Sequence, residues 1–185
     1  MKASPLSVRQ LTRIALMSAL ISVCAWITIP LTVPFTLQLL GVFLALRLLG
    51  GRDGTLSIAL YILLGAVGLP VFANFSAGLG ALIGPTGGYI LGFLLMGVLY
   101  WILEKHLTKR LYLELALVFG LVICYAFGTC WFSVVMNARG KGISFFSGLG
   151  ICVFPFILPD LAKLAVSGLL AAQLQKVLRL GNAGK

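Results

Sequence analysis

Two residues of opposite charge, Asp160 and Lys163, stand three positions apart in a long apolar stretch near the C-terminus. No other charged residue occurs between Lys141 and Lys176. In a helix, this spacing places both side chains on one face. Ionisable groups within apolar helices normally face the protein interior or a cavity. The pair therefore predicts a polar ligand site, with a purely structural ion pair as the alternative.

A glycine-rich stretch, residues 68–92, holds the second group of candidates. Asn74 offers both a hydrogen-bond donor and an acceptor, although its amide could instead satisfy the loop. Pro85 and Thr86 precede an apolar run as a turn and a cap would, so the first N–H groups of that helix could bind an anion. Glycine at a helix entrance is also typical of a simple turn. The candidates at this entrance are Gly87, Gly88 and Tyr89.

The composition indicates a membrane protein and excludes several classes of function. Of the 185 residues, 61% are hydrophobic and only 10% are charged, and the mean hydropathy is +1.11. A soluble domain carries about 25% charged residues, so a soluble enzyme, a disordered chain and a nucleic-acid-binding module are excluded. The sequence contains no catalytic triad, no metal-spaced His/Cys cluster and no Walker motif. We therefore expect no enzyme activity, no cofactor and no ATP hydrolysis by this chain alone.

Uncharged stretches predict an all-α fold of six transmembrane helices in a single integral membrane domain, residues 1–185. A helix that crosses a bilayer takes about 20 residues, and prolines divide the longer runs. Pro155 and Pro159 are expected to confine the regular part of the last helix to residues after 159. The expected helices cover about 11–29, 37–49, 55–68, 87–103, 114–136 and the stretch from 159 to about 175. The segments 30–36 and 69–86 are expected to be irregular and to close over a ligand.

The basic residues predict the orientation of these helices. Lys and Arg alternate between rich and empty loops, and only Arg139 and Lys141 fall on the poor side. Because Lys and Arg collect in cytoplasmic loops, both termini are expected to be cytoplasmic, in the cytoplasmic (inner) membrane of a bacterium. Ala15 and Ala19 on the first helix form a small-xxx-small pattern, which permits close approach of another helix; internal packing is the alternative.

Four motifs follow one another along nearly the whole chain. They are Val33-Pro34-Phe35-Thr36-Leu37-Gln38, Gly68-Leu69-Pro70-Val71-Phe72 with Asn74 and Gly78, Gly84-Pro85-Thr86-Gly87-Gly88-Tyr89, and Pro159-Asp160-Leu161-Ala162-Lys163. Together they resemble the BioY family of biotin-specific substrate-binding (S) components of energy-coupling-factor (ECF) transporters. The resemblance implies six helices with cytoplasmic termini, biotin as the substrate, and as partners a coupling transmembrane protein and two ATPase subunits. It also implies that Ala15 and Ala19 contact the coupling protein.

The chemistry of biotin fits these candidates. Its neutral ureido ring presents two N–H donors and one carbonyl, which Asp160, Lys163 and Asn74 can match. Its carboxylate would then lie near the helix entrance at Gly87; the reversed pose, with the carboxylate on Lys163, stays open. Four aromatic residues could pack on the apolar body of the ligand, although each is also a candidate core residue: Phe35, Phe72, Phe75 and Tyr89.

Three other functions remain open from the sequence. A stand-alone facilitator or secondary transporter would take up its substrate without coupling subunits, although no inverted repeat is apparent. The substrate could be another vitamin, such as thiamine or riboflavin. An intramembrane enzyme that uses Asp160 and Lys163 as acid and base is the third alternative, and product formation would distinguish it.

Overall fold

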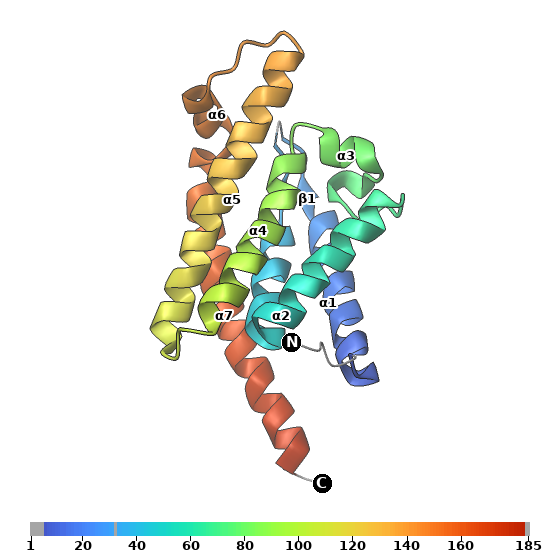
Figure 1. The fold of residues 1–185 in the computed structure, drawn as a ribbon, viewed down its shortest axis with the longest axis vertical. Helices are drawn as coiled ribbons and strands as arrows, with labels where there is room; N and C mark the ends of the chain where they lie inside the picture. The colour runs from blue at the N-terminus through green and yellow to red at the C-terminus, as the bar shows by residue number, and fades with distance from the viewer. Residues whose placement is uncertain (1–5, 32, 184–185) are drawn as a thin grey trace.

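The computed structural model describes residues 6–31 and 33–183, and the side chains among them up to residue 176. The described chain is mainly helical (Figure 1). Four helices are long and apolar enough to cross a membrane: α1, α4, α5 and the Phe154–Lys176 part of α7. The elements are, in order, α1 (Val8–Trp26), β1 (Thr28–Ile29), β2 (Phe35–Thr36), α2 (Gln38–Ala66), the 3₁₀ helix η1 (Ala73–Phe75), α3 (Leu79–Ile83), α4 (Gly87–Glu104), α5 (Arg110–Ala138), α6 (Phe145–Cys152) and α7 (Phe154–Ala183).

Helix α1 begins at a capping box and presents two different faces. The Ser7 hydroxyl accepts from the N–H of Gln10, and the Gln10 side chain accepts from the N–H of Ser7, which satisfies N–H groups that a helix start leaves unpaired. One face is buried against α2 through Ile14, Ile21 and Ala25. The opposite face, which includes Ala15 and Ala19, is exposed.

Helix α2 reverses direction at Gly50. This glycine has φ 80° and ψ 175°, a conformation that side chains disfavour. A Cβ on Gly54 would sit 2.9 Å from the Cα of Leu46, so the halves on either side of Gly50 run back along each other. The sequence predicted two helices at 37–49 and 55–68; the structure has two halves, but the second begins directly after Gly50 and ends at Ala66.

The start of α7 differs from the prediction. The helix begins at Phe154, so the regular part is not confined to residues after 159 and Pro159 lies inside the helix. Pro155 lies in the first turn, where a missing N–H is tolerated, and Pro159 removes only one hydrogen bond near the helix start. The sequence also gave no indication of α6, nor of α3 and η1 within the segment 69–86. The expected irregular segment 30–36 ends in β2, which pairs with β1 in a short hairpin, Thr28 opposite Thr36.

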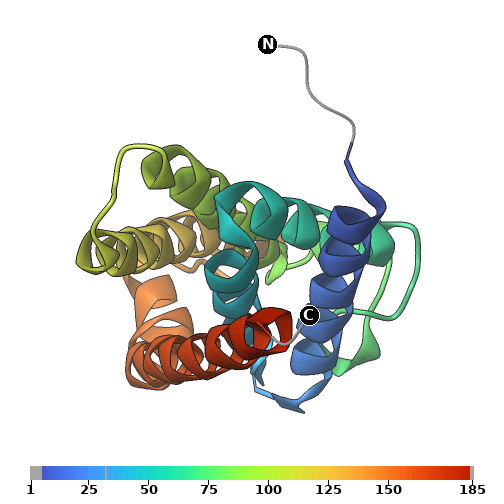
Figure 2. The same cartoon turned by 90° about the horizontal axis from the view of Figure 1, so that it is seen from below.

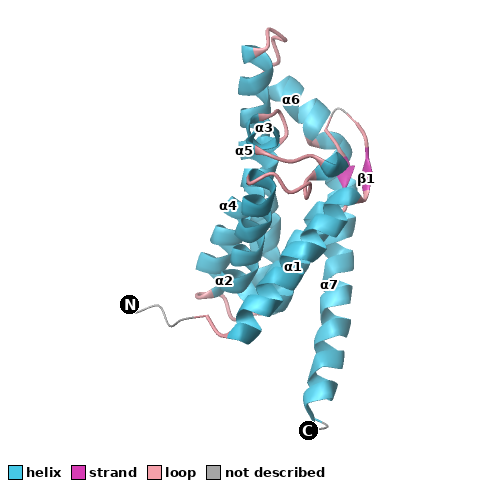
Figure 3. Ribbon diagram, turned by 90° about the vertical axis from the view of Figure 1, so that its right-hand side faces the viewer, coloured by secondary structure: helices cyan, strands magenta, loops and turns pink. Residues whose placement is uncertain are grey.

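The helices converge around α2. It packs against α1, α4 and α7 and lies between them when the molecule is viewed from below (Figure 2). The start of α1 and the end of α7 lie at one end of the bundle, whereas the β hairpin, α3 and α6 lie at the other (Figures 1 and 3). We refer to these as the terminal end and the hairpin end.

Candidate ligand-binding site

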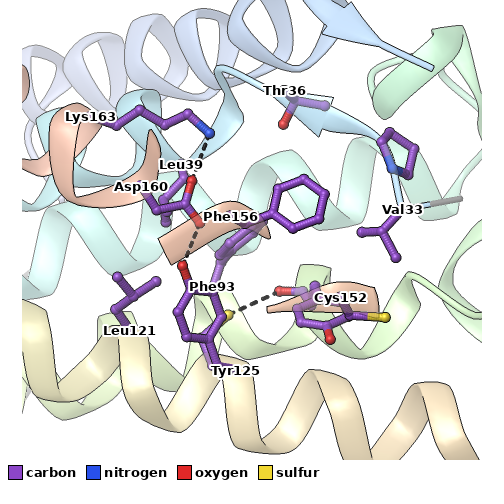
Figure 4. Close-up of a pocket in the computed structure, with 13 residues that line it drawn as sticks. Val33, Thr36, Leu39, Phe93, Leu121, Tyr125, Cys152, Phe156, Asp160 and Lys163 are labelled. Carbon is purple, nitrogen blue, oxygen red and sulfur yellow. Dashed lines mark hydrogen bonds and ion pairs between the residues drawn. The ribbon is translucent and has the colours of Figure 1, made fainter. Parts of the chain in front are cut away.

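Asp160 and Lys163 lie together on α7 and are almost completely buried, with 6% and 7% of their surface exposed. The Lys163 Nζ donates to Asp160 Oδ1 at 2.7 Å. The other oxygen, Oδ2, accepts a hydrogen bond from the Tyr125 hydroxyl of α5 at 2.6 Å. Asp160 is thus held from two sides, as Figure 4 shows. Charge-assisted hydrogen bonds of this kind hold a buried carboxylate in a fixed direction.

The pair with Asp160 does not use all the hydrogen-bond donors of Lys163. Its ammonium group also lies 4.1 Å from the ring centre of Phe35, a cation–π contact, and Phe35 stacks on Phe156 with 6.1 Å between centroids. An ammonium has three N–H donors, and only one hydrogen bond of Lys163 is made within the described chain. The remaining donors are available to a ligand.

The pair lines a cavity of about 80 Å³ that joins a larger one of about 260 Å³. The two share Thr36, Tyr89, Phe93 and the hairpin residues Val33 and Pro34, so they form one continuous cleft. The smaller cavity is lined further by Leu39, Leu121, Cys124, Tyr125, Cys152, Phe156, Asp160 and Lys163. The larger is lined further by Gln38, Phe72, Ala73, Asn74, Ser76, Ala81, Thr86 and Ile90. A mostly apolar cleft with a few polar groups is typical of a small-molecule site.

Asn74 lines the larger cavity and presents a neutral amide there, whereas the charged Asp160–Lys163 pair lines the smaller cavity. It lies in η1 with φ 55° and ψ 32°, the left-handed conformation that asparagine tolerates better than most residues. Gln38, at the start of α2, lines the same part, and its N–H bonds to the Thr36 hydroxyl at 3.2 Å. The cleft therefore has neutral amides at one end and an ion pair at the other.

Helix α5 fixes the middle of the cleft. Its Thr129 hydroxyl is 2.9 Å from the Tyr89 hydroxyl, and its Cys124 thiol donates to the Tyr89 carbonyl at 3.6 Å. Gly92 of α4 permits this approach, because a Cβ there would lie 2.7 Å from the Cys124 sulfur. Tyr125 and Thr129 are one turn apart, so one face of α5 orients both Asp160 and Tyr89.

Four expected site residues line neither cavity. Phe35 is one of them, although its ring lies against the Lys163 ammonium group. Gly87 and Gly88 are buried and line neither cavity; their missing side chains make room for α3 and for Trp131 of α5. The N–H groups of Gly87 and Tyr89 are bonded to the carbonyls of Gly84 and Thr86, so this helix entrance is not an open anion site. Phe75 is exposed and stacks on Trp26 at 5.2 Å.

The segment over the larger cavity is tied down at both ends. The Trp26 indole donates to the Pro70 carbonyl at 2.8 Å, and the Trp131 indole donates to the Gly84 carbonyl at 3.0 Å. Between these points, Asn74 and Phe75 both have positive φ. We call residues 70–84 the cover segment. Two tryptophans on separate helices thus hold it in place.

Sequence reasoning missed Tyr125, Gln38, Phe93 and Phe156. An aromatic or amide residue within an apolar helix looks like core packing, and only Gln38 carried a signal, as a polar side chain within an otherwise apolar run. The role of Tyr125 depends on the packing of α5 beside α7, which no local spacing specifies.

Several known proteins resemble this chain over most of its length. The chain is 46% identical to "Biotin transporter BioY" of Thermotoga maritima, over 91% of this chain and 97% of the relative. It is 38% identical to "Probable biotin transporter BioY" of Pyrococcus horikoshii, over 90% and 96%. The crystal structure of the S-component for biotin from an ECF-type ABC transporter superposes with a TM-score of 0.81 at 28% identity, covering 91% of this chain and 92% of that one. The BioY family model matches residues 1–180, and the chain therefore belongs to the BioY family.

Proposed function

We propose that this chain captures biotin in the cleft and is the substrate-binding component of a multi-pass transporter of the cytoplasmic membrane. Membership of a family of transporters and the names of the relatives support uptake of biotin rather than catalysis. The observation that carries the assignment to this cleft is the buried Asp160–Lys163 pair, which lines the cavity while Lys163 keeps spare donors.

In the proposed pose, the ureido ring lies at the charged end of the cleft. Lys163 donates to the ureido carbonyl, and Asp160 accepts a ureido N–H with a lone pair not used by Tyr125 or Lys163. A neutral ring suits a pair whose charges cancel. The apolar rings of Phe93 and Phe156 line this end, and the valerate chain extends toward Asn74. The carboxylate then meets neutral donors rather than the entrance of α4.

Binding measurements on the purified chain test this site. Lys163→Ala leaves Asp160 without its cationic partner and removes the donor to the ureido carbonyl, so we expect biotin affinity to fall by about 100-fold, or roughly 2.7 kcal/mol. Asp160→Asn is expected to act in the same direction. Lys176→Ala is the matched control, because Lys176 is an exposed lysine on the same helix. Isothermal calorimetry that gives an affinity of Lys163→Ala within twofold of the unchanged protein would refute the site.

The pose is tested with a ligand that lacks the carboxylate charge. Biotin methyl ester keeps the ureido ring and is expected to lose no more than about tenfold in affinity, because only neutral groups face its ester. In the reversed pose the ester would lose the charge-assisted contact to Lys163. A loss for the ester equal to that of Lys163→Ala would therefore favour the reversed pose.

The six-span topology with both ends in the cytoplasm remains our proposal for the membrane arrangement. The two halves of α2 would supply the two crossings beyond α1, α4, α5 and α7. The terminal end holds most of the basic residues, which supports a cytoplasmic position for it. The cleft then opens outward, under the hairpin and the cover segment. Labelling of single cysteines placed at residues 141 and 109 is expected to succeed from outside only at 141.

Release of biotin inward is proposed to require a coupling membrane protein and two ATPase subunits. The exposed face of α1 with Ala15 and Ala19 is the proposed contact with the coupling protein, because small residues permit close helix packing. Ala15→Leu with Ala19→Leu is expected to abolish co-purification with that protein while leaving biotin binding intact. Ala126→Leu, an equivalent change on the exposed face of α5, is the control. A complex that survives the double change would contradict this interface.

A further inference from the structure

A third cavity, of about 170 Å³, lies between four helices and shares no residue with the cleft. Its residues lie on the parts of α2, α4, α5 and α7 that point toward the terminal end (Figure 1). It is lined by Arg47, Tyr100, Arg110, Leu113, Glu114, Ala171, Ala172 and Gln175. Unlike the cleft, it has two arginines in its wall, together with one tyrosine. Two of the residues that α7 contributes to the wall are alanines, whose short side chains leave room.

Arg47 is committed to the protein itself. Its guanidinium is paired with Glu114 and donates to the Leu164 carbonyl at 2.7 Å and to the Ser167 hydroxyl at 2.6 Å. Its side chain is only 7% exposed. Because Arg47 neutralises Glu114, the net charge of the cavity wall is set by Arg110.

Two other polar side chains in the wall, those of Tyr100 and Arg110, are not bonded in this way. Tyr100 is 4% exposed, and its hydroxyl makes no hydrogen bond to any residue that the structure describes. The oxygen is not among the polar atoms enclosed by protein, so it opens onto the cavity. Arg110 is exposed and forms no ion pair within the described chain. A buried hydroxyl and an exposed guanidinium can both donate hydrogen bonds to an anionic oxygen.

The backbone adds to this preference for an anion. Arg110 is the first residue of α5, a helix of 29 residues, and the first hydrogen bonds of the helix run from Tyr112 and Leu113 to the Lys109 carbonyl. The N–H groups of Arg110 and Leu111 precede these bonds, and the positive end of the helix dipole points the same way. The cavity thus combines a helix start, a guanidinium and an unpartnered hydroxyl.

We infer that this cavity binds the phosphate group of an anionic phospholipid. A phospholipid and a soluble phosphate ester would both present a phosphate, and the residues around the cavity favour the phospholipid. Exposed leucines are sequence neighbours of two wall residues, Leu115 after Glu114 on α5 and Leu174 before Gln175 on α7, and they would contact acyl chains. Basic pockets between helices near the cytoplasmic surface bind lipid head groups of this kind.

Thermal unfolding of the purified chain in a non-ionic detergent tests the inference. Added phosphatidylglycerol is expected to raise the melting temperature by about 5 °C at saturation, whereas phosphatidylcholine, which carries no net charge, is expected to change it by less than about 1 °C. Glycerol 3-phosphate supplies the phosphate without acyl chains and is expected to have as little effect. Arg110→Gln and Tyr100→Phe are each expected to reduce the phosphatidylglycerol shift by at least about half.

Lys105→Gln is the matched control, because it removes the same charge at the same end of the bundle but Lys105 does not line the cavity. It is expected to keep the full shift. Native mass spectrometry is expected to show one tightly retained phosphatidylglycerol in the unchanged chain and none in Arg110→Gln. Three results would overturn the inference: equal shifts with both lipids, an equal shift with glycerol 3-phosphate, or a full shift in Arg110→Gln.

Discussion

Two ion pairs lie in the bundle, a buried one toward the hairpin end and a partly buried one toward the terminal end, and they are built differently. Asp160 and Lys163 lie on the same helix at i, i+3, and the pair lines the ligand cleft. Arg47 and Glu114 lie on α2 and α5, and Arg47 also holds the backbone of α7 through the Leu164 carbonyl. The first pair is bonded to one other helix, α5, through Tyr125, whereas the second joins three helices, α2, α5 and α7.

This difference indicates what each pair contributes. Removing two charges from water costs more than their attraction returns unless further hydrogen bonds complete the arrangement. Arg47 obtains these bonds from the protein, and Gly168 makes room for it, since a Cβ there would lie 2.9 Å from Arg47 Nη1. Lys163 obtains only one bond from the described protein. We propose that a ligand offsets the cost of burying the Asp160–Lys163 pair, whereas the fold itself offsets that of the Arg47–Glu114 pair.

The largest expected effect on stability is that of Arg47→Ala. The change leaves the partly exposed Glu114 without its partner and removes the two hydrogen bonds from Arg47 to α7, and we expect these losses together to cost about 3 kcal/mol. We expect the melting temperature in detergent to fall by roughly 10 °C. Arg139→Ala, at an exposed position, is the control. A melting temperature within about 2 °C of the unchanged protein would show that the pair does not hold the three helices together.

Replacing both members of each pair sharpens the comparison. Arg47→Met with Glu114→Leu is expected to recover most of the stability lost by Arg47→Ala, because no charge is left buried and unpaired. It is expected to bind biotin normally. Asp160→Asn with Lys163→Met is expected to be as stable as the unchanged protein, yet to bind biotin about 100-fold more weakly, since the ligand contacts are gone.

Thermal unfolding and isothermal calorimetry of the two double variants show whether each pair serves stability or biotin binding. We expect the Asp160→Asn, Lys163→Met variant to lose biotin binding without losing stability, and the Arg47→Met, Glu114→Leu variant to keep biotin binding. If the Asp160→Asn, Lys163→Met variant binds biotin normally, that pair has a structural role. If the Arg47→Met, Glu114→Leu variant loses biotin binding while it stays folded, the two halves of the bundle are coupled.

The sequence was sufficient to predict the Asp160–Lys163 pair, because helical spacing alone places both residues on one face. Helix ends marked by backbone chemistry were also predicted well, such as the start of α4 at Gly87 and the break near Gly50. Helix α4 begins at Gly87 as expected, although the Thr86 side chain makes no capping hydrogen bond. The break falls at Gly50, but the second half of α2 begins directly after it and not near residue 55.

Features that depend on packing between distant segments were not predictable in this way. Arg47 was grouped with the charges at the membrane surface, but the structure buries it among α2, α5 and α7. Phe75 was expected to contact the ligand, but it stacks on Trp26, which lies 49 positions earlier in the chain. Pro155 and Pro159 were expected to confine the regular part of the last helix to residues after 159, but α7 begins at Phe154, because tertiary contacts outweigh the loss of one hydrogen bond.

The smallest expected effect concerns Tyr125, which links the Asp160–Lys163 pair to a second helix. Tyr125→Phe removes the hydroxyl that donates to Asp160 Oδ2 at 2.6 Å and keeps the ring. A hydrogen bond to a charged group contributes about 1.5 kcal/mol, so we expect roughly tenfold weaker biotin binding with little change in melting temperature. Tyr112→Phe, on the exposed surface of α5, is the control.

A double-mutant cycle shows whether Tyr125 acts through Asp160. In the Asp160→Asn background, Tyr125→Phe is expected to cost less than about threefold in affinity, because the carboxylate that the hydroxyl orients is absent. Asp160 gains its only described link to α5 from this hydroxyl, so its direction toward the ligand depends on α5 as well as on α7. A full tenfold loss in that background would mean that Tyr125 contacts biotin directly, and the cleft would then gain a third polar contact in place of a positioning residue.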